Sequence, residues 1–240
     1  MIAEGAAFPS SDLDWKERQL PIEKAGDSIK ISQEMMDDVD FVESEINNFL
    51  LRNVKLTIDA QLLSGDGSSP NLVGMADSAT AFAAGDFADS IQDASYYDLI
   101  TVIGAQIATG TDYMPTAALM HPTDAAKMKL KKDGENNYVL PPFVVSTPDG
   151  NFVVDGMVVV PNSGVTVNTM YVGDFTRGTV YSSGEFRIEM GFVDDDFGKD
   201  LVTVKARERL ALLIRNVDTG AFVEVTDIDA ALTAIEESVD

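Results

Sequence analysis

Four aspartates in the last third of this 240-residue chain come nearest to a chemical site by residue type and spacing. Asp194, Asp195 and Asp196 are consecutive, and Asp200 follows four positions later. Carboxylate oxygens are ligands that Ca²⁺ and Mg²⁺ prefer, so this group could hold a hard cation. Acidic runs beside a strand more often form solvated turns, however, and we expect that role here.

His121 and Asp124 form a second candidate, because a histidine with an acidic neighbour can relay protons. No Gly-x-Ser-x-Gly motif supplies a nucleophile, and His121 precedes Pro122 at the start of a predicted helix, which favours a structural role. The segment 65–70 lacks the Gly-Lys-Ser/Thr of a phosphate loop, and no Gly-x-Gly-x-x-Gly motif occurs. We therefore expect no catalytic, cofactor-binding or metal-binding residue, and no enzyme activity.

The net charge of −23, from 40 acidic and 17 basic residues, disfavours several classes of partner. Nucleic-acid affinity comes mostly from Lys and Arg that displace counterions, so direct nucleic-acid binding is not expected. The absence of cysteine excludes disulfides and thiolate chemistry, and a single histidine excludes multi-histidine metal sites. No apolar run approaches the roughly 20 residues that span a bilayer, and no signal peptide is visible. We expect cytosolic synthesis and no membrane partner.

Residues 40 to 64 carry the clearest helical pattern. Asp40 and Glu43 form a capping-box-like start, and Gly65 ends the pattern. At 1.5 Å per residue the predicted helix is about 35 Å long, and such a helix usually backs a sheet. Its predicted apolar stripe, at spacings of three and four, comprises Val42, Ile46, Phe49, Leu50, Leu56, Ala60 and Leu63.

The middle of the chain, residues 95 to 190, predicts a mixture of helices and short strands. Helices are expected at 96–103 and 122–131, the second opened by proline in its first turn. Turn signals such as those at 147–151 separate the strands. These strands are expected at 117–120, 143–146, 152–154, 157–160, 170–173, 179–181 and 186–190.

The two ends of the chain differ in character. Residues 200–212 alternate apolar and polar side chains around a central Arg-Glu-Arg, which predicts a long strand with one buried face, and residues 220–225 predict a closing strand. Residues 28–32 also alternate as a strand. The segment before them has too little apolar mass for its own core, so we expect it either to lie on another surface or to be a frayed end.

Several short motifs, taken in order along the chain, resemble those of tailed-bacteriophage major capsid proteins. The resemblance covers nearly the whole chain, and the order and spacing of the motifs carry it. The motifs are Ile31-Ser32-Gln33-Glu34-Met35-Met36-Asp37-Asp38 at the start of the family's spine helix, Gly65-Asp66-Gly67 at its end, Asn71-Leu72-Val73-Gly74-Met75 after it, Met120-His121-Pro122-Thr123-Asp124, Gly173-Asp174-Phe175, and Arg207-Glu208-Arg209 followed by Ala221-Phe222-Val223.

The resemblance implies an α+β fold, the phage capsid fold that encapsulin shells share. This fold has an extended loop, a peripheral domain in which a long spine helix packs against a β-sheet, and a mixed α/β axial domain. Mapped onto this sequence, the extended loop is 1–28, the peripheral domain 29–74 with return strands in 191–226, and the axial domain 75–190. Residues 227–240 would be an acidic C-terminal extension.

Two departures from the family pattern are expected. Family members carry an N-terminal arm, and often a scaffolding segment, before the extended loop, whereas this sequence starts inside that loop, so we expect an N-terminally truncated member. Some relatives join their subunits by a Lys–Asn isopeptide bond that a Glu promotes. The corresponding positions here are Glu17, Asp200 and Arg207, and we therefore expect no such crosslink.

The function that the resemblance implies is that of a structural subunit of an icosahedral phage or prophage head, assembled as pentamers and hexamers around the genome. The implied partners are copies of itself, a scaffolding protein, a head protease and a portal, and the implied location is the virion, after assembly in the bacterial cytoplasm. The acidity suits a shell that does not hold its genome tightly, but solubility or an acid-biased source explains it as well. An encapsulin-like compartment enclosing cargo enzymes is the alternative. Inter-subunit contacts are expected at Phe8, Trp15, Lys16, Arg18, Arg207 and Arg209.

Overall fold

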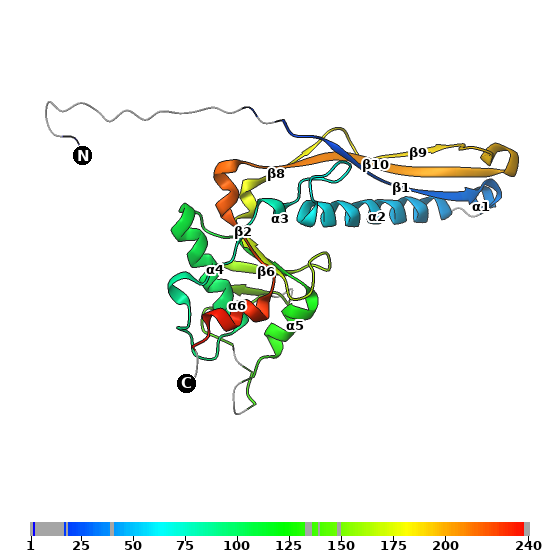
Figure 1. Cartoon of the computed structure of the whole chain (residues 1–240). Coiled ribbons are helices and arrows are strands. Elements are labelled where there is room, and N and C mark those ends of the chain that lie inside the picture. The colour runs from blue at the N-terminus through cyan, green and yellow to red at the C-terminus, as the bar shows by residue number, and fades with distance from the viewer. Residues whose placement is uncertain are drawn as a thin grey trace.

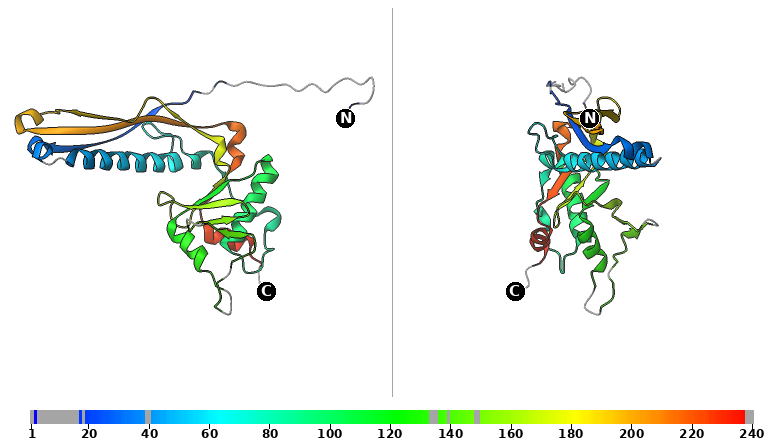
Figure 2. Two further views of the ribbon diagram at one scale, coloured as in Figure 1. Left: turned by 180° about the vertical axis from the view of Figure 1, so that it is seen from behind. Right: turned by 90° about the vertical axis from the view of Figure 1, so that its right-hand side faces the viewer.

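The computed structural model describes Ile2, Glu17 and residues 19–38, 41–132, 136–138, 140–147 and 150–237. These residues form an elongated arm and a more compact body, and the arm projects sideways from one end of the body (Figures 1 and 2). From β1 onward the described chain runs through the arm, enters the body after the long helix, returns to the arm for three strands and then re-enters the body. Segments far apart in the sequence therefore build each part.

The arm is built on a sheet whose central strand is β10 (Leu201–Ile214). Strand β1 (Glu23–Ser32) runs antiparallel along one edge of β10, from Glu23 opposite Leu210 to Ser32 opposite Leu201. The other edge of β10 pairs in succession with β8 (Gly178–Ser182) and β9 (Arg187–Gly191). The sequence mapping had placed these two strands in the axial domain with the middle of the chain. Instead they lie in the arm, because the ladder with β10 is a non-local pairing that the local pattern does not reveal.

Helix α2 (Val42–Ser64) lies along one face of the arm sheet, as the sequence predicted (Figure 1). Its side chains that face the sheet recur at every fourth position, and they pack against Val204, Ala206 and Leu210 of β10. The buried row on the helix comprises Val42, Ile46, Leu50, Val54 and Ile58.

Two members of the predicted stripe point away from this core. Phe49 and Leu56 are each 52% exposed, whereas Val54 and Ile58, which the predicted stripe omitted, are buried. Consecutive helical residues are about 100° apart around the axis, so Phe49 cannot share the direction of its buried neighbour Leu50. The expected cap, Asp40, lies outside the described residues, and Phe41 occupies the N-cap position without a side-chain cap.

The distal tip of the arm closes the sheet through two short helical segments. Helix α1 (Gln33–Asp38) continues from β1, and the 3₁₀ turn η3 (Asp196–Lys199) connects β9 to β10. The backbone N–H of Gln33 donates to the carbonyl of Asp200 at 2.9 Å, which ties the two segments together.

The body contains a second sheet, in the order β2-β11-β7-β3-β6-β5-β4. Strand β3 pairs parallel with β6, and β11 pairs parallel with β2, while the other ladders are antiparallel. Every residue of β7 is buried, as expected for a strand covered on both faces. The bounds are β2 Thr80–Ala81, β3 Ala117–Met120, β4 Val144–Ser146, β5 Phe152–Val154, β6 Met157–Pro161, β7 Met170–Gly173 and β11 Phe222–Val225.

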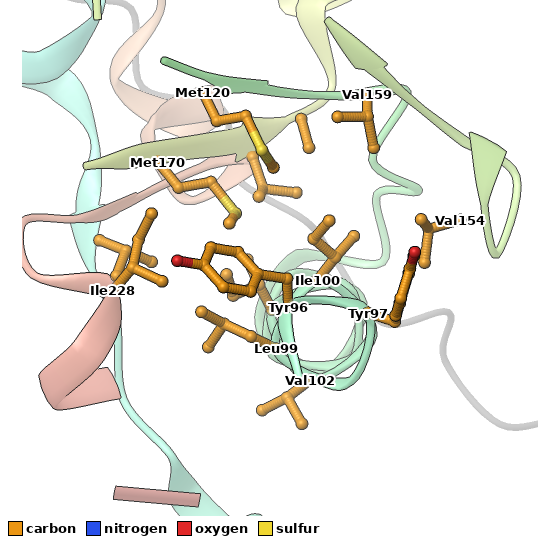
Figure 3. Close-up of a cluster of buried hydrophobic side chains, with 14 of the residues drawn as sticks. Tyr96, Tyr97, Leu99, Ile100, Val102, Met120, Val154, Val159, Met170 and Ile228 are labelled. Carbon is orange, nitrogen blue, oxygen red and sulfur yellow. The ribbon is translucent and has the colours of Figure 1, made fainter. Parts of the chain in front are cut away.

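The core of the body lies between this sheet and helix α4 (Tyr96–Thr111). In Figure 3, Tyr96 and Ile100 of α4 face Met120 and Met170 of the sheet. A capping box starts the helix: the N–H of Ser95 donates to Asp98 Oδ2 at 2.9 Å, and Ser95 Oγ accepts from the N–H of Asp98. The helix runs eight residues beyond the predicted 96–103. Helix α5 is Pro122–Leu130, and the shorter segments are α3 Met75–Ser78, η1 Gly85–Phe87, η2 Phe175–Arg177 and η4 Asn216–Ala221.

The last described segment belongs to the body rather than to the arm. Strand β11 pairs with β7 in the body sheet, although the sequence mapping had grouped it with the peripheral return strands. Helix α6 (Ile228–Ile235) follows it, and its Ile228, Ala231 and Ile235 are buried in the body core. The sequence had suggested only an acidic extension here. Among the described residues, no helix has the length and apolar character needed to cross a membrane.

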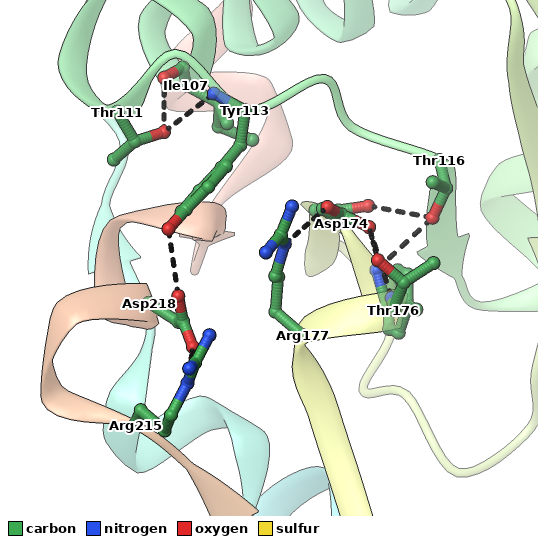
Figure 4. A network of polar contacts seen from close by, with 11 residues as sticks. Ile107, Thr111, Tyr113, Thr116, Asp174, Thr176, Arg177, Arg215 and Asp218 are labelled. Carbon is green, nitrogen blue, oxygen red and sulfur yellow. Dashed lines mark hydrogen bonds and ion pairs between the residues drawn. The ribbon is translucent and has the colours of Figure 1, made fainter.

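A polar network joins arm and body where they meet (Figure 4). Tyr113, which follows α4, donates its hydroxyl to Asp218 Oδ1 at 2.9 Å, and Arg215 Nε donates to Asp218 Oδ2 at 2.6 Å. The guanidinium of Arg177 lies 4.3 Å from the Tyr113 ring centre and pairs with Asp174 at 3.1 Å. Because Arg215 directly follows β10 and Tyr113 lies two residues beyond the last residue of α4, the network ties the arm to the body.

Candidate functional site

The candidate site is the face of the arm sheet that points away from α2. Ala25, Ile29 and Ile31 of β1 pack in the core under α2 together with Val204 and its buried neighbours on β10. Since successive side chains on a strand point to opposite faces, the intervening residues point outward. We call this surface the outer arm face; it carries Lys24, Lys30, Arg187, Glu189, Lys205, Arg207 and Arg209.

Both arginines predicted from the sequence as contact residues lie on the outer arm face. Arg207 donates from Nη2 to Glu189 Oε1 at 2.6 Å, and Lys205 pairs with the other oxygen of the same carboxylate at 3.0 Å. The hydrogen bond from Lys205, together with the charge of Arg207, lowers the pKa of Glu189. Arg209 is exposed and has no ion-pair partner in the described part of the chain.

A polar hollow of about 230 Å³ opens at one end of this face. It forms where residues 183–186 leave the ladder, between the last β8 pair, Ser182 with Leu210, and the first β9 pair, Arg187 with Arg207. The N–H of Ser183 still donates to the carbonyl of Arg209 at 2.8 Å and holds the rim. The hollow is lined by Ser183, Gly184, Glu185, Arg187, Arg207, Glu208 and Arg209. Its guanidinium groups suit a carboxylate ligand.

In the acidic run at the tip of the arm, Asp194–Asp196, the last residue has a structural role. Asp196 is fully buried; it accepts from the N–H of Val193 at 2.9 Å and from the Thr203 hydroxyl at 2.7 Å, and pairs with Lys30 at 2.7 Å. The hydrogen bonds from Lys30 and Thr203 lower the pKa of Asp196 to about 2. Among the described residues, no group of three or more acidic, histidine or cysteine side chains is placed to hold a metal ion.

His121 and Asp124 do not form a proton relay. The Nδ1 atom of His121 accepts from the N–H of Thr123 at 3.1 Å, so the imidazole caps α5. Asp124 is buried and is bound instead by the ammonium of Lys127 at 2.8 Å and the N–H of Asn168 at 2.7 Å. Both side chains therefore stabilise the fold, and for His121 this is the structural role predicted from its position before Pro122.

The other predicted contact residues, Phe8, Trp15, Lys16 and Arg18, lie outside the described residues. The sequence reasoning missed Lys24, Arg187 and Lys205, which the strand register brings beside the predicted arginines. The period-two spacing of Lys24 and Lys30 on β1 was an available signal, but the sequence does not state which strands are neighbours.

Comparison with known proteins identifies relatives for this architecture. The phage capsid family matches residues 1–226. The major capsid protein of Enterobacteria phage HK97 is 30% identical over 220 residues, which cover 88% of this chain and 54% of that protein. The chain thus spans about half the length of this curated relative.

Solved structures share the fold at low sequence identity. The capsid of an empty GTA particle matches with a TM-score of 0.64 and 16% identity, over 92% of this chain and 80% of the other. A structure from Gordonia phage Cozz matches with a TM-score of 0.65 and 12% identity, over 93% and 76% of the two chains. These likenesses confirm the predicted phage capsid fold. With a family match over residues 1–226 and this fold, the chain belongs to the phage capsid family.

Proposed function

We propose that this chain is a structural subunit of an icosahedral phage or prophage head, and that its copies assemble into pentamers and hexamers that enclose the genome. The observation that carries the proposal is the family match over residues 1–226, on a chain whose arm and body reproduce a capsid fold. The role is structural and includes no catalytic step. The proposed location is the virion, after synthesis and assembly in the bacterial cytoplasm.

The proposed domain assignment follows the two parts of the molecule. The arm, with α2 on its sheet, corresponds to the peripheral domain, and the body corresponds to the axial domain. Within this proposal β8 and β9 are assigned to the peripheral domain and β11 and α6 to the axial domain, because those are the sheets and cores that they join. Of residues 1–28, which the sequence mapping gave to the extended loop, those from Glu23 onward form β1 in the arm sheet, so the proposed extended loop is residues 1–22.

The proposed partners are first of all other copies of the chain, with a scaffolding protein, a head protease and a portal as further partners. We propose inter-subunit contacts at Arg207 and Arg209 and, in the extended loop, at Phe8, Trp15, Lys16 and Arg18. The position of both arginines on the outer arm face, where Arg209 is exposed and Arg207 is half-buried, supports the first two. No specific nucleic-acid or membrane binding is part of the proposal.

Sedimentation velocity and negative-stain electron microscopy of the purified chain, over a range of concentrations, test the proposal. We expect rings of five and six subunits or closed polyhedral shells, which loosen as salt screens the charged contacts. A monomer at every concentration would contradict the proposal. Shells purified from the host that contain cargo enzymes in place of nucleic acid would support the compartment alternative.

A further inference from the structure

The outer arm face concentrates positive charge in a chain that is strongly acidic overall. Among the described residues it carries six of the 17 basic side chains. The side chains of neighbouring strands form rows across this face, and two of these rows follow one another along β10. In the Arg209 row, Lys24 of β1 is opposite Arg209. In the Arg207 row, Gly26 of β1 and Arg187 of β9 are opposite Arg207.

The Arg209 row holds two cations that lack a counter-ion in the isolated chain. Lys24 and Arg209 are exposed and have no ion pair within the described residues. Like charges directly opposite one another destabilise a sheet. The polar hollow of about 230 Å³ opens beside Arg209 and gives access to the row from outside. The charges of the Arg209 row therefore favour the binding of an external carboxylate.

The Arg207 row is built differently. Glu189 accepts a hydrogen bond from Arg207 Nη2 at 2.6 Å, so this guanidinium is held in place. Gly26 carries no side chain, and a Cβ there would lie only 2.9 Å from the carbonyl oxygen of Ala206, so the β1 side of the row stays low. Arg187 is exposed on the other side. A low surface beside two guanidinium groups suits an aromatic ring, because arginine stacks on indole faces.

The segment before β1 carries complementary groups at a matching spacing. Residues 1–22 hold four acidic and two basic side chains, and Glu17 is exposed. In an extended strand, side chains two positions apart point to the same side and lie about 7 Å from each other. Trp15 and Glu17 have this spacing, and so do Arg207 and Arg209 on β10. The basic neighbours of Glu17 in the sequence then project from the opposite side, away from the cations of the face.

We propose that Trp15 and Glu17 of one copy bind the outer arm face of a second copy. The Glu17 carboxylate pairs with Lys24 and Arg209 of the Arg209 row, and the indole of Trp15 stacks on the guanidinium groups of the Arg207 row. This inference rests on the proposed shell function and specifies one of its contacts. The two surfaces are different, so the contact is heterologous, and such contacts close into rings when the rotation between copies allows.

The structure favours a second copy over the same chain as the partner. Residues 19–22 continue from the start of β1 in the direction away from the arm tip and leave the sheet (Figure 1). Both rows lie on the tip side of Glu23, so Glu17 is on the opposite side of Glu23 from its own rows. The six residues from Glu17 to Glu23 span at most about 20 Å when extended, and this length carries Glu17 toward a neighbouring copy.

The segment of a second copy is a better occupant than nucleic acid. A polyanion that lay along the face would meet Glu189 and, at the hollow, Glu185 and Glu208. Beyond the face it would also meet a chain whose remaining charge is strongly negative. The segment with Trp15 and Glu17 presents one ring and one carboxylate to the two rows, without a continuous phosphate backbone.

Charge reversal tests the proposal without disturbing any ion pair in the described residues. A face variant carries Lys24→Glu and Arg209→Glu, a loop variant carries Glu17→Arg, and a combined variant carries all three changes. The face variant keeps like charges opposite each other, as in the wild type. The matched control carries Arg52→Glu and Lys55→Glu, which reverse two exposed cations on α2 away from the outer arm face. Circular dichroism verifies that each variant is folded.

Trp15 is the only tryptophan of the chain, so its fluorescence reports on this segment alone. As assemblies of the wild type appear in sedimentation velocity, we expect the emission of Trp15 to move to shorter wavelength and acrylamide to quench it less. The face variant and the loop variant should each raise the concentration at which assemblies appear by about fivefold or more, since exposed charge pairs are lost. The combined variant and the α2 control should assemble near the wild-type concentration and show the wild-type change in fluorescence.

The outcomes separate the contact from the function. If the wild type forms shells while Trp15 stays as accessible to acrylamide as in the monomer, or if the face and loop variants assemble equally well, the proposed contact is wrong and the shell function stands. If the folded combined variant fails to assemble, the two groups are not partners. Protection of Trp15 in the monomer would place the segment on its own chain.

Two further outcomes concern the partner and the function. Binding of double-stranded DNA that only the face variant loses, with assembly unchanged, would assign the face to nucleic acid. A wild type that stays monomeric would overturn the shell function and this contact with it.

Discussion

Leu50 and Leu56 occupy the same helix but opposite environments, and the same substitution at each tests the packing of α2. Leu50 is completely buried against β10, whereas Leu56 is 52% exposed. Truncating a buried leucine to alanine removes its transfer free energy and leaves a cavity, at a cost of about 2–5 kcal/mol. We therefore expect Leu50→Ala to lower the free energy of unfolding by about 3 kcal/mol.

The matched Leu56→Ala change should cost about 1 kcal/mol or less, because water already reaches half of that side chain and no cavity forms. The intrinsic helix propensity changes equally in both variants, so it cancels in the comparison. For a chain of this size 1 kcal/mol shifts the midpoint of thermal unfolding by about 2–4 °C. The expected shifts are thus about 6–12 °C for Leu50→Ala and a few degrees for Leu56→Ala.

Thermal unfolding followed by circular dichroism at 222 nm, at a concentration where the chain is monomeric, measures both shifts. The monomer is required because an exposed leucine could become buried in an assembly. Equal shifts, or a larger shift for Leu56→Ala, would refute the reasoning. Either result would mean that Leu56 is buried against the sheet together with Leu50, as in the stripe predicted from sequence, and that the buried row does not continue from Leu50 to Val54 and Ile58.

Three further predictions follow from single hydrogen-bonded groups. The fold lowers the pKa of Asp196 from 3.8 to about 2, so the ionised carboxylate stabilises the fold above about pH 4, and this stabilisation is lost as the pH falls towards 2. In the Asp196→Asn variant, melting temperatures measured between pH 2 and 5 should no longer show this pH dependence. An unchanged pH profile would contradict the role given to the Asp196 carboxylate. The Tyr113→Phe change removes the hydrogen bond from the Tyr113 hydroxyl to the buried Asp218 and should lower the free energy of unfolding, measured in urea, by about 1–2 kcal/mol. A change near zero would contradict the role of the polar network between arm and body. Ser95→Ala removes the cap of α4 and should cost about 1 kcal/mol, whereas Ser95→Asp should retain most of the stability; equal losses would argue against capping.

For the outer arm face, the local sequence pattern predicted the strand, whereas the neighbours across the sheet depend on the strand register. Alternation along β10 correctly predicted a strand with one buried face, and the bunched charges on that strand led to Arg207 and Arg209 as predicted contact residues. It did not reveal that Lys24 and Arg187 lie opposite them, since those residues are 183 and 20 positions from Arg207 along the chain. That cross-strand arrangement of cations is evident only in the folded structure.

The prediction of the body was similarly uneven. The short strands and the start of α4 were located from turn signals and apolar runs, because those signals act within a few residues. Helix α6 was not predicted, since its acidic flanks masked three apolar positions that become a buried face only against the body core. The placement of β8 and β9 in the arm, likewise, depends on which strand they pair with.

The sequence by itself determined most of the strands, the long helix α2, the acidic character and the order of motifs that resembles capsid proteins. Those properties arise from side-chain periodicity, turn residues and composition, which act locally or sum over the chain. The tertiary structure alone decided which face of α2 is buried, which strands share the arm sheet, and that cations from three strands gather on one surface. Those features depend on pairings between residues far apart in the sequence, whose free energy exists only when the whole fold has formed.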